Sequence, residues 1–166
     1  SHAWCQSQLW PRLCGIQIVG MDSEYDSGSY TAVTGNDGNG PPVEPDELLA
    51  RFILFSRHIR QSDGTIKPDA FVPHPHTDCS VSRHTGIPEH DLWGLGKSVA
   101  IQRNRTLSGR ADIVAEEVRR FRPLDLVAAE PPPNHVNITN WPGEKSEQKM
   151  LAMELAQLAK YHPLTS

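Results

Sequence analysis

Apolar residues in this chain occur only in short segments, and this feature limits the fold more than any other. No apolar run is longer than the one from Phe52 to Phe55, whereas a helix that crosses a bilayer needs about 20 apolar residues. A membrane-spanning fold is therefore not expected. The 166 residues suffice for one ordinary domain built around one hydrophobic core.

The short segments show both strand and helix patterns. Strands are predicted at 48–55, 80–83, 124–129 and 135–139, helices at 88–102 and 144–161, and the segment 111–118 fits either type. In the last helix, one apolar stripe is expected to hold Met150, Leu151, Leu155, Leu158 and Ala159. The sequence thus predicts a single small α+β (mixed α/β) domain, in which two or three helices, including a C-terminal one, pack on a sheet of about four to five strands.

The first 42 residues differ in composition from the rest. Residues 1–20 have neither helical nor strand periodicity, so we interpret them as a tag, a linker or a misassigned upstream start before Met21. Residues 22–42 are rich in Ser, Gly, Asp and Asn, which is typical of a linker. We therefore expect a disordered leader over residues 1–42 and one globular domain over residues 43–166.

Charge and cysteine content restrict the partners and the compartment. The formal net charge is −4, of which residues 1–43 carry −3 and the other 123 residues carry −1. This near-neutral domain favours a protein partner over nucleic acid. The cysteines Cys5, Cys14 and Cys79 do not make a closed disulfide framework, and no signal peptide is evident, so a soluble cytoplasmic protein is expected.

A His-rich segment at 74–80 is the clearest candidate for a metal site. His74 and His76 project to the same side of an extended chain, and Asp78 follows. The spelling HxHxD resembles the first metal motif of metallo-β-lactamase-like hydrolases, and HxHTxxS resembles the opening motif of polymerase and histidinol phosphatase-type phosphoesterases. Both folds need more His and Asp motifs than the rest of the chain supplies, so we assign no residue a role from either family. The alternatives are a divalent metal site and a solvated loop that binds no cofactor.

Other polar residues are candidates for catalysis or ligand binding. His135 and Asn137 lie on one side of the predicted strand 135–139, and His76, Asp78, Arg83 and His84 complete the candidate catalytic set. Arg83 and Arg110 are candidates for holding an anionic group. Arginines at positions 103, 105, 110, 119, 120 and 122 would form either a phosphate- or RNA-binding rim or a solvated face.

The sequence Gly94-Leu95-Gly96-Lys97-Ser98 spells the end of a phosphate-binding loop. The first glycine of that motif is replaced by Asp91, and Pro88 marks a helix start where the motif requires a strand. We therefore expect the two glycines to allow close packing of a helix.

No complete catalytic constellation is present. The sequence accordingly favours an accessory or binding protein that acts in a complex. The alternative is a small hydrolase, of the phosphoesterase or nuclease kind, that uses a His/Asp/Arg site with or without a metal.

Overall fold

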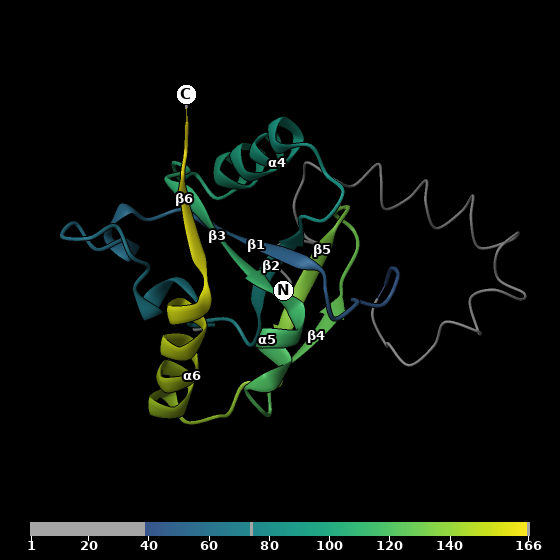
Figure 1. Cartoon of the computed structure of the whole chain (residues 1–166), viewed down its shortest axis with the longest axis vertical. Coiled ribbons are helices and arrows are strands. Elements are labelled where there is room, and N and C mark those ends of the chain that lie inside the picture. Colours follow the sequence, from purple (N-terminus) through teal and green to yellow (C-terminus); the bar gives the residue numbers. More distant parts are fainter. Residues whose placement is uncertain (1–38, 74, 166) are drawn as a thin grey trace, which may run out of the picture.

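The computed structural model describes residues 39–73 and 75–165, which form one antiparallel sheet with helices on both faces (Figure 1). The strands are β1 (Leu48–Ile53), β2 (Cys79–Arg83), β3 (Gly109–Val114), β4 (Asp125–Ala128), β5 (His135–Thr139) and β6 (Lys160–Pro163). They lie in the order β4-β5-β2-β1-β3-β6, and every neighbouring pair is antiparallel. The predicted α+β class and single small domain are confirmed, but the sheet has six strands where four to five were expected.

Three α-helices and two short 3-10 turns complete this part of the chain. The helices are α4 (Glu89–Gln102), α5 (Ala115–Arg120) and α6 (Lys145–Leu158), and the turns are η1 (Ser56–His58) and η2 (Pro68–Ala70). The segment 111–118 fitted either type because it contains the end of β3 and the beginning of α5. In the described ranges, none of these helices combines the length and the apolar character needed to cross a membrane.

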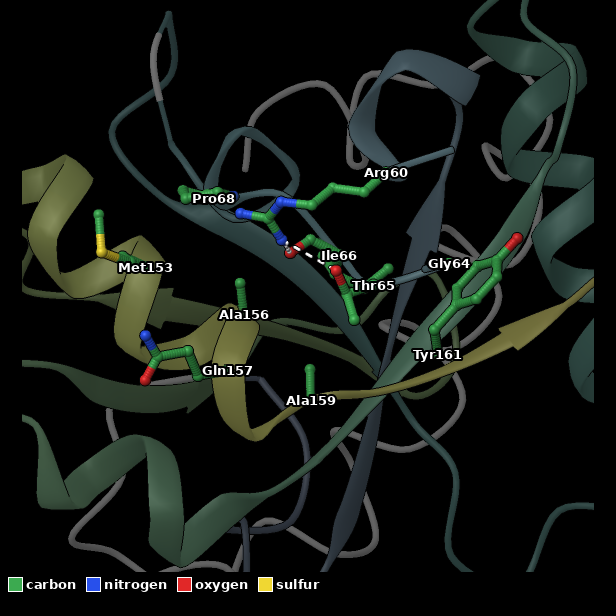
Figure 2. A pocket seen from close by; sticks show the side chains of 10 residues that line it. All are labelled: Arg60, Gly64, Thr65, Ile66, Pro68, Met153, Ala156, Gln157, Ala159 and Tyr161. Atoms are coloured by element: carbon green, nitrogen blue, oxygen red, sulfur yellow. Dashed lines mark hydrogen bonds between the residues drawn. The ribbon is translucent and has the colours of Figure 1, made fainter. Parts of the chain in front are cut away.

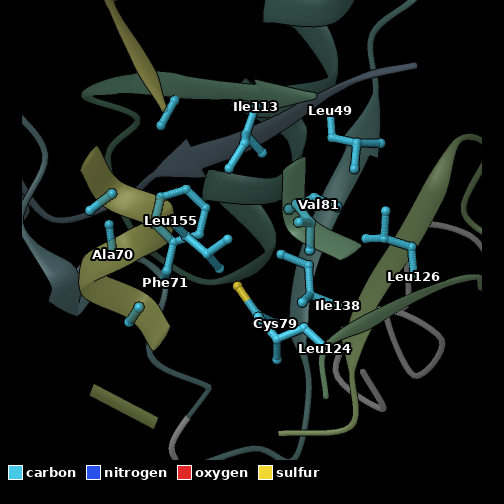
Figure 3. Packing of buried hydrophobic residues seen from close by; sticks show 14 of the residues in the cluster. Leu49, Ala70, Phe71, Cys79, Val81, Ile113, Leu124, Leu126, Ile138 and Leu155 are labelled. Carbon is cyan, nitrogen blue, oxygen red and sulfur yellow. The ribbon is translucent and has the colours of Figure 1, made fainter. Parts of the chain in front are cut away.

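Strand alternation divides the core into two clusters on opposite faces of the sheet. From β1, Leu49 and Ile53 enter the larger cluster, whereas Ala50 and Phe52 enter the smaller cluster beneath α4. The larger cluster lies between the sheet and α6, where Leu155 is fully buried in the same cluster as Ala70 of η2 and Ile113 of β3 (Figure 3). Burying a leucine or isoleucine of this size contributes about 1.5–3 kcal/mol.

The C-terminal helix is shorter than predicted, and its buried face is different. It ends at Leu158, and the chain then forms β6, which pairs with the otherwise free edge of β3. Met150 and Leu158 were expected on the core stripe, but they are 66% and 42% exposed. Ala152 and Ala156 are buried in their place, and their small side chains suit the close contact between α6 and η2.

The smaller cluster depends on a close approach between α4 and β1. A Cβ atom on Gly96 would lie 2.8 Å from ring carbons of Phe52, so only glycine fits at this point of the helix. A Cβ atom on Gly94 would meet nothing within 4 Å. The expectation that this glycine motif serves helix packing is therefore confirmed for Gly96.

We predict opposite effects for alanine at these two positions of α4. Gly96→Ala should destabilise the domain by about 1–3 kcal/mol because the new methyl group overlaps the Phe52 ring. Gly94→Ala should stabilise it by up to about 1 kcal/mol through helix propensity. Urea unfolding of the two variants measures both effects. An equal gain in stability for both variants would show that α4 does not pack on Phe52.

Candidate functional site

Only part of the predicted metal site lies in the described part of the chain. His76 is exposed and Asp78 half-buried, in the loop before β2, while His74 lies outside the described residues. Within the described ranges, no three His, Cys, Asp or Glu side chains are grouped so that they could hold a metal ion. A metal at His74, His76 and Asp78 stays a prediction.

Arg83, at the end of β2, is engaged in local structure. Its Nε atom lies 3.5 Å from Glu47 Oε1, and its NH2 group donates to the carbonyl of Pro41. These contacts tie the segment before β1 to the sheet. Arg83 lines neither of the two pockets described below.

His135 and Asn137 of β5 are buried, and they share one face of the sheet as predicted. His135 lies opposite Ser82 and Asn137 opposite Ser80 in the β2–β5 register. The His135 Nδ1 atom lies 3.0 Å from the Ala129 carbonyl, and a carbonyl only accepts, so Nδ1 carries the proton. Burial lowers the pKa of His135 to about 4, and the ring is therefore neutral near pH 7.

Two other predicted residues, His84 and Arg110, do come together. They meet Glu89 at the start of α4, Asp112 on β3 and His162 on β6, and we call these five residues the Asp112 cluster. Arg110 and Asp112 are two residues apart on β3, so both side chains point to the same face. Both are buried, with relative exposures of 2% and 5%.

Arg110 is held by two carboxylates and one aromatic ring. Its NH1 and NH2 groups donate to the two oxygens of Glu89 at 3.0 and 2.6 Å, and its Nε donates to Asp112 Oδ1 at 3.0 Å. The guanidinium lies 4.6 Å from the centre of the Trp93 ring. Burial alone would lower the pKa of Arg110, but the hydrogen bonds to the two carboxylates more than offset it, and the pKa is raised.

Glu89 and the two histidines complete the Asp112 cluster. The hydrogen bonds from Arg110 lower the pKa of Glu89, and Trp93 Nε1 also donates to Glu89, at 2.8 Å. Both histidines approach one carboxylate oxygen: the Nε2 atoms of His84 and His162 lie 3.4 and 3.3 Å from Asp112 Oδ2. A buried carboxylate thus orients two partly exposed imidazoles.

The Asp112 cluster lines a pocket of about 470 Å³ together with Leu48, Ile113, Val114, Glu117, Leu158 and Lys160. Asp112, Glu89 and His162 were not predicted as site residues. The alternation Arg110-Ala111-Asp112 is a sequence signal for Asp112, but only when the strand is distinguished from the helix that follows it. His162 had no such signal, because β6 itself was not predicted.

A larger pocket, of about 570 Å³, lies between α6 and the turn at 60–66 (Figure 2). Arg60 points into this pocket but is already bound to the Thr65 hydroxyl and the Ile66 carbonyl, at 3.0 Å each. Its lining includes no Asp, Glu, His or Lys. This pocket therefore lacks the acid–base groups that the Asp112 cluster offers.

A second site of a different kind lies beyond the end of β1. The guanidinium carbons of Arg57 and Arg105 lie 4.5 and 4.6 Å from the centre of the half-buried Phe55 ring. The His58 ring centre is 5.1 Å from that of Phe55. We call these four residues the Phe55 surface. Both arginines are exposed, and neither forms an ion pair with a carboxylate among the described residues.

The end of α4 explains how Arg105 reaches Phe55. Asn104 has φ +53, and its N–H donates to the Ile101 carbonyl at 3.0 Å, while the N–H of Arg105 donates to the Ala100 carbonyl at 2.8 Å. Together with the left-handed conformation of Asn104, these two hydrogen bonds make a Schellman motif, which reverses the chain direction at a helix C-terminus. The motif fixes the backbone of Arg105 where the helix ends.

Charges of both signs lie near the Phe55 surface. Burial is the main reason that the pKa of His58 is lowered; Asp69 has the largest charge effect and raises it, whereas Arg57, Arg51 and Lys67 lower it. Burial likewise lowers the pKa of Arg103, with a smaller contribution from Arg51. The predicted rim of arginines over 103–122 does not form as one patch: Arg110 lies in the Asp112 cluster, and Arg119 pairs with Asp125 at 3.1 Å.

Comparisons with protein-family models, with curated proteins and with solved structures found no match for this chain. The two sites themselves are therefore the basis for inferring a function.

The buried His135 should make stability dependent on pH. Because folding lowers its pKa from 6.5 to about 4, the stabilisation is complete above pH 6.5 and is lost as the pH falls toward 4. We predict that His135 contributes a loss of about 2 kcal/mol between pH 7 and pH 4.5. Urea unfolding at both pH values measures this loss.

His135→Asn keeps a side-chain donor for the Ala129 carbonyl but cannot take up a proton, so its stability should fall less steeply with acid than that of the wild type. His90→Gln is the matched control, because His90 is 99% exposed. An equally steep fall for His135→Asn and the wild type would assign the proton uptake to another group.

Proposed function

We propose that this protein is an accessory binding protein whose partner is a single-stranded nucleic acid held on the Phe55 surface. The observation that carries the proposal is that two exposed arginines, 48 positions apart in the sequence, lie over one aromatic ring and have no carboxylate partner among the described residues. The charge of the domain as a whole favoured a protein partner. The local arrangement of charge supports a polyanion.

Several other arginines of the domain have their charge or their donors already engaged. Arg83, Arg110 and Arg119 pair with carboxylates. Arg51 donates to the carbonyls of Ala70 and Ser80, both at 2.8 Å. Arg57 and Arg105 differ because the guanidinium carbon of each lies over the Phe55 ring, and neither has a carboxylate partner among the described residues. The N–H edge of a guanidinium binds a phosphate through two parallel hydrogen bonds.

The aromatic component favours a single strand over a duplex. Unpaired bases stack on aromatic rings and on guanidinium planes, and each such contact contributes about 1–3 kcal/mol. The bases of a duplex are already stacked on one another and do not offer their faces. One phenylalanine with two arginines over its ring thus brings planar groups for stacking and cationic groups for phosphate contact to the same place.

We predict that Arg57→Ala combined with Arg105→Ala weakens binding to a fluorescein-labelled oligouridylate roughly ten- to hundred-fold at about 0.1 M salt. The slope of log affinity against log salt should fall by about 1.4, because two phosphate contacts are lost. Fluorescence anisotropy over a series of salt concentrations measures both quantities.

The matched control is Arg120→Ala with Arg122→Ala, which removes two exposed arginines at and after the end of α5. Equal weakening in the two double variants would show that net charge alone attracts the oligonucleotide and would refute a site at Phe55. Displacement of the oligonucleotide by polyglutamate as effective as that by unlabelled oligouridylate would assign the surface to an acidic protein instead.

A further inference from the structure

The Asp112 cluster has a geometry that suits proton transfer. His84 Nε2 lies 3.3 Å from Arg110 NH2, which can only donate, and 3.4 Å from Asp112 Oδ2. An unprotonated Nε2 accepts from Arg110, and a protonated Nε2 donates to Asp112. The same nitrogen therefore has a partner in both states, and the ring can exchange a proton without leaving its place.

His162 supplies a second imidazole on the same carboxylate. Its Nε2 is 3.3 Å from Asp112 Oδ2, and among the described residues neither His84 nor His162 has a hydrogen-bond partner at Nδ1. Two histidines on one pocket can act together, one as a base and the other as an acid. Asp112 touches both rings and would act as a positioning residue.

The lining of the pocket restricts the reaction. Among the described residues, it contains acid–base groups but no Ser, Thr, Tyr or Cys side chain, so the lining offers no hydroxyl or thiol nucleophile of its own. An RNA strand carries its own nucleophile, the 2′-hydroxyl, beside each phosphodiester, and an internal group of this kind has a large effective concentration.

The net charge of the pocket lining is compatible with a bound phosphodiester when one of the two histidines is protonated. Arg110 and Lys160 oppose three lining carboxylates, those of Glu89, Asp112 and Glu117. With one of the two histidines protonated, the lining sums to zero. An acid–base pair requires this same state, with one ring neutral and the other charged.

We propose that the Asp112 cluster cleaves single-stranded RNA by transesterification, with His84 and His162 as the acid–base pair. The neutral imidazole takes the proton of the 2′-hydroxyl, and the 2′-oxygen forms a new bond to phosphorus. The bond between phosphorus and the 5′-oxygen breaks, and the protonated imidazole gives its proton to that oxygen. The products are a 2′,3′-cyclic phosphate and a 5′-hydroxyl.

This inference rests on the proposed function for its substrate class, and the test separates the two. The full chain is incubated with oligouridylate and with the dinucleotide uridylyl-adenosine, and chromatography detects the cyclic phosphate. Replacing the ribose with 2′-deoxyribose at one linkage should abolish cleavage there. His84→Gln and His162→Gln should each lower the rate roughly 100-fold or more while oligouridylate binding is retained.

His90→Gln, prepared in the same way, should cleave like the wild type because His90 is exposed and lies outside the pocket. Circular dichroism verifies the fold of each variant, and Asn is also tested at positions 84 and 162 in case Gln prevents folding. Wild-type rates in the His84 and His162 variants, or bound oligouridylate that is never cleaved, would overturn the inference and leave the binding function standing. Cleavage of the dinucleotide without oligouridylate binding would support catalysis by the Asp112 cluster and refute nucleic-acid binding at the Phe55 surface.

Discussion

The register between β1 and β3 is the constraint on which both the core and the charged site depend. All six residues of β1 pair with β3, from Leu48 opposite Val114 to Ile53 opposite Gly109. This pairing directs Ile113 into the larger core and Arg110 and Asp112 to the opposite face. A slip by one residue would exchange the two faces and place both charges in the apolar core. The charged residues therefore select the register as strongly as the apolar ones do.

The buried charges of β3 are acceptable only as a connected set. A buried guanidinium loses several kcal/mol of solvation, and the hydrogen bonds to Glu89 and Asp112 offset that loss. Glu89 sits in the first turn of α4, so the same ion pair fixes one end of that helix. Its other end is fixed by the Schellman motif at Asn104, and Gly96 sets how closely the middle approaches Phe52. The position of α4 thus links the Asp112 cluster to the Phe55 surface.

Local patterns in the sequence predicted much of the sheet but not its edge. The alternation over 135–139 identified β5, because a buried face repeats every second residue and is visible in a short segment. β6 has no such pattern: Lys160 to Pro163 is polar and ends in proline, both of which suit an edge strand. It is a strand because β3 offers unpaired backbone groups, and that is a tertiary effect. His162 could not be assigned to a site for the same reason.

The two sites also differ in how far a sequence can reveal them. Arg110 and Asp112 are neighbours on one strand, so half of the Asp112 cluster follows from recognising that strand. Arg57 and Arg105 meet only because α4 lies across the sheet and its C-terminal turn points back to the end of β1. Neither arginine has a signal in its own neighbourhood that distinguishes it from a solvated arginine. Within residues 39–73 and 75–165, what distinguishes them is the lack of a carboxylate partner combined with a shared aromatic ring, and both properties exist only after folding. These two properties are the basis of the proposal that the Phe55 surface binds an external anion.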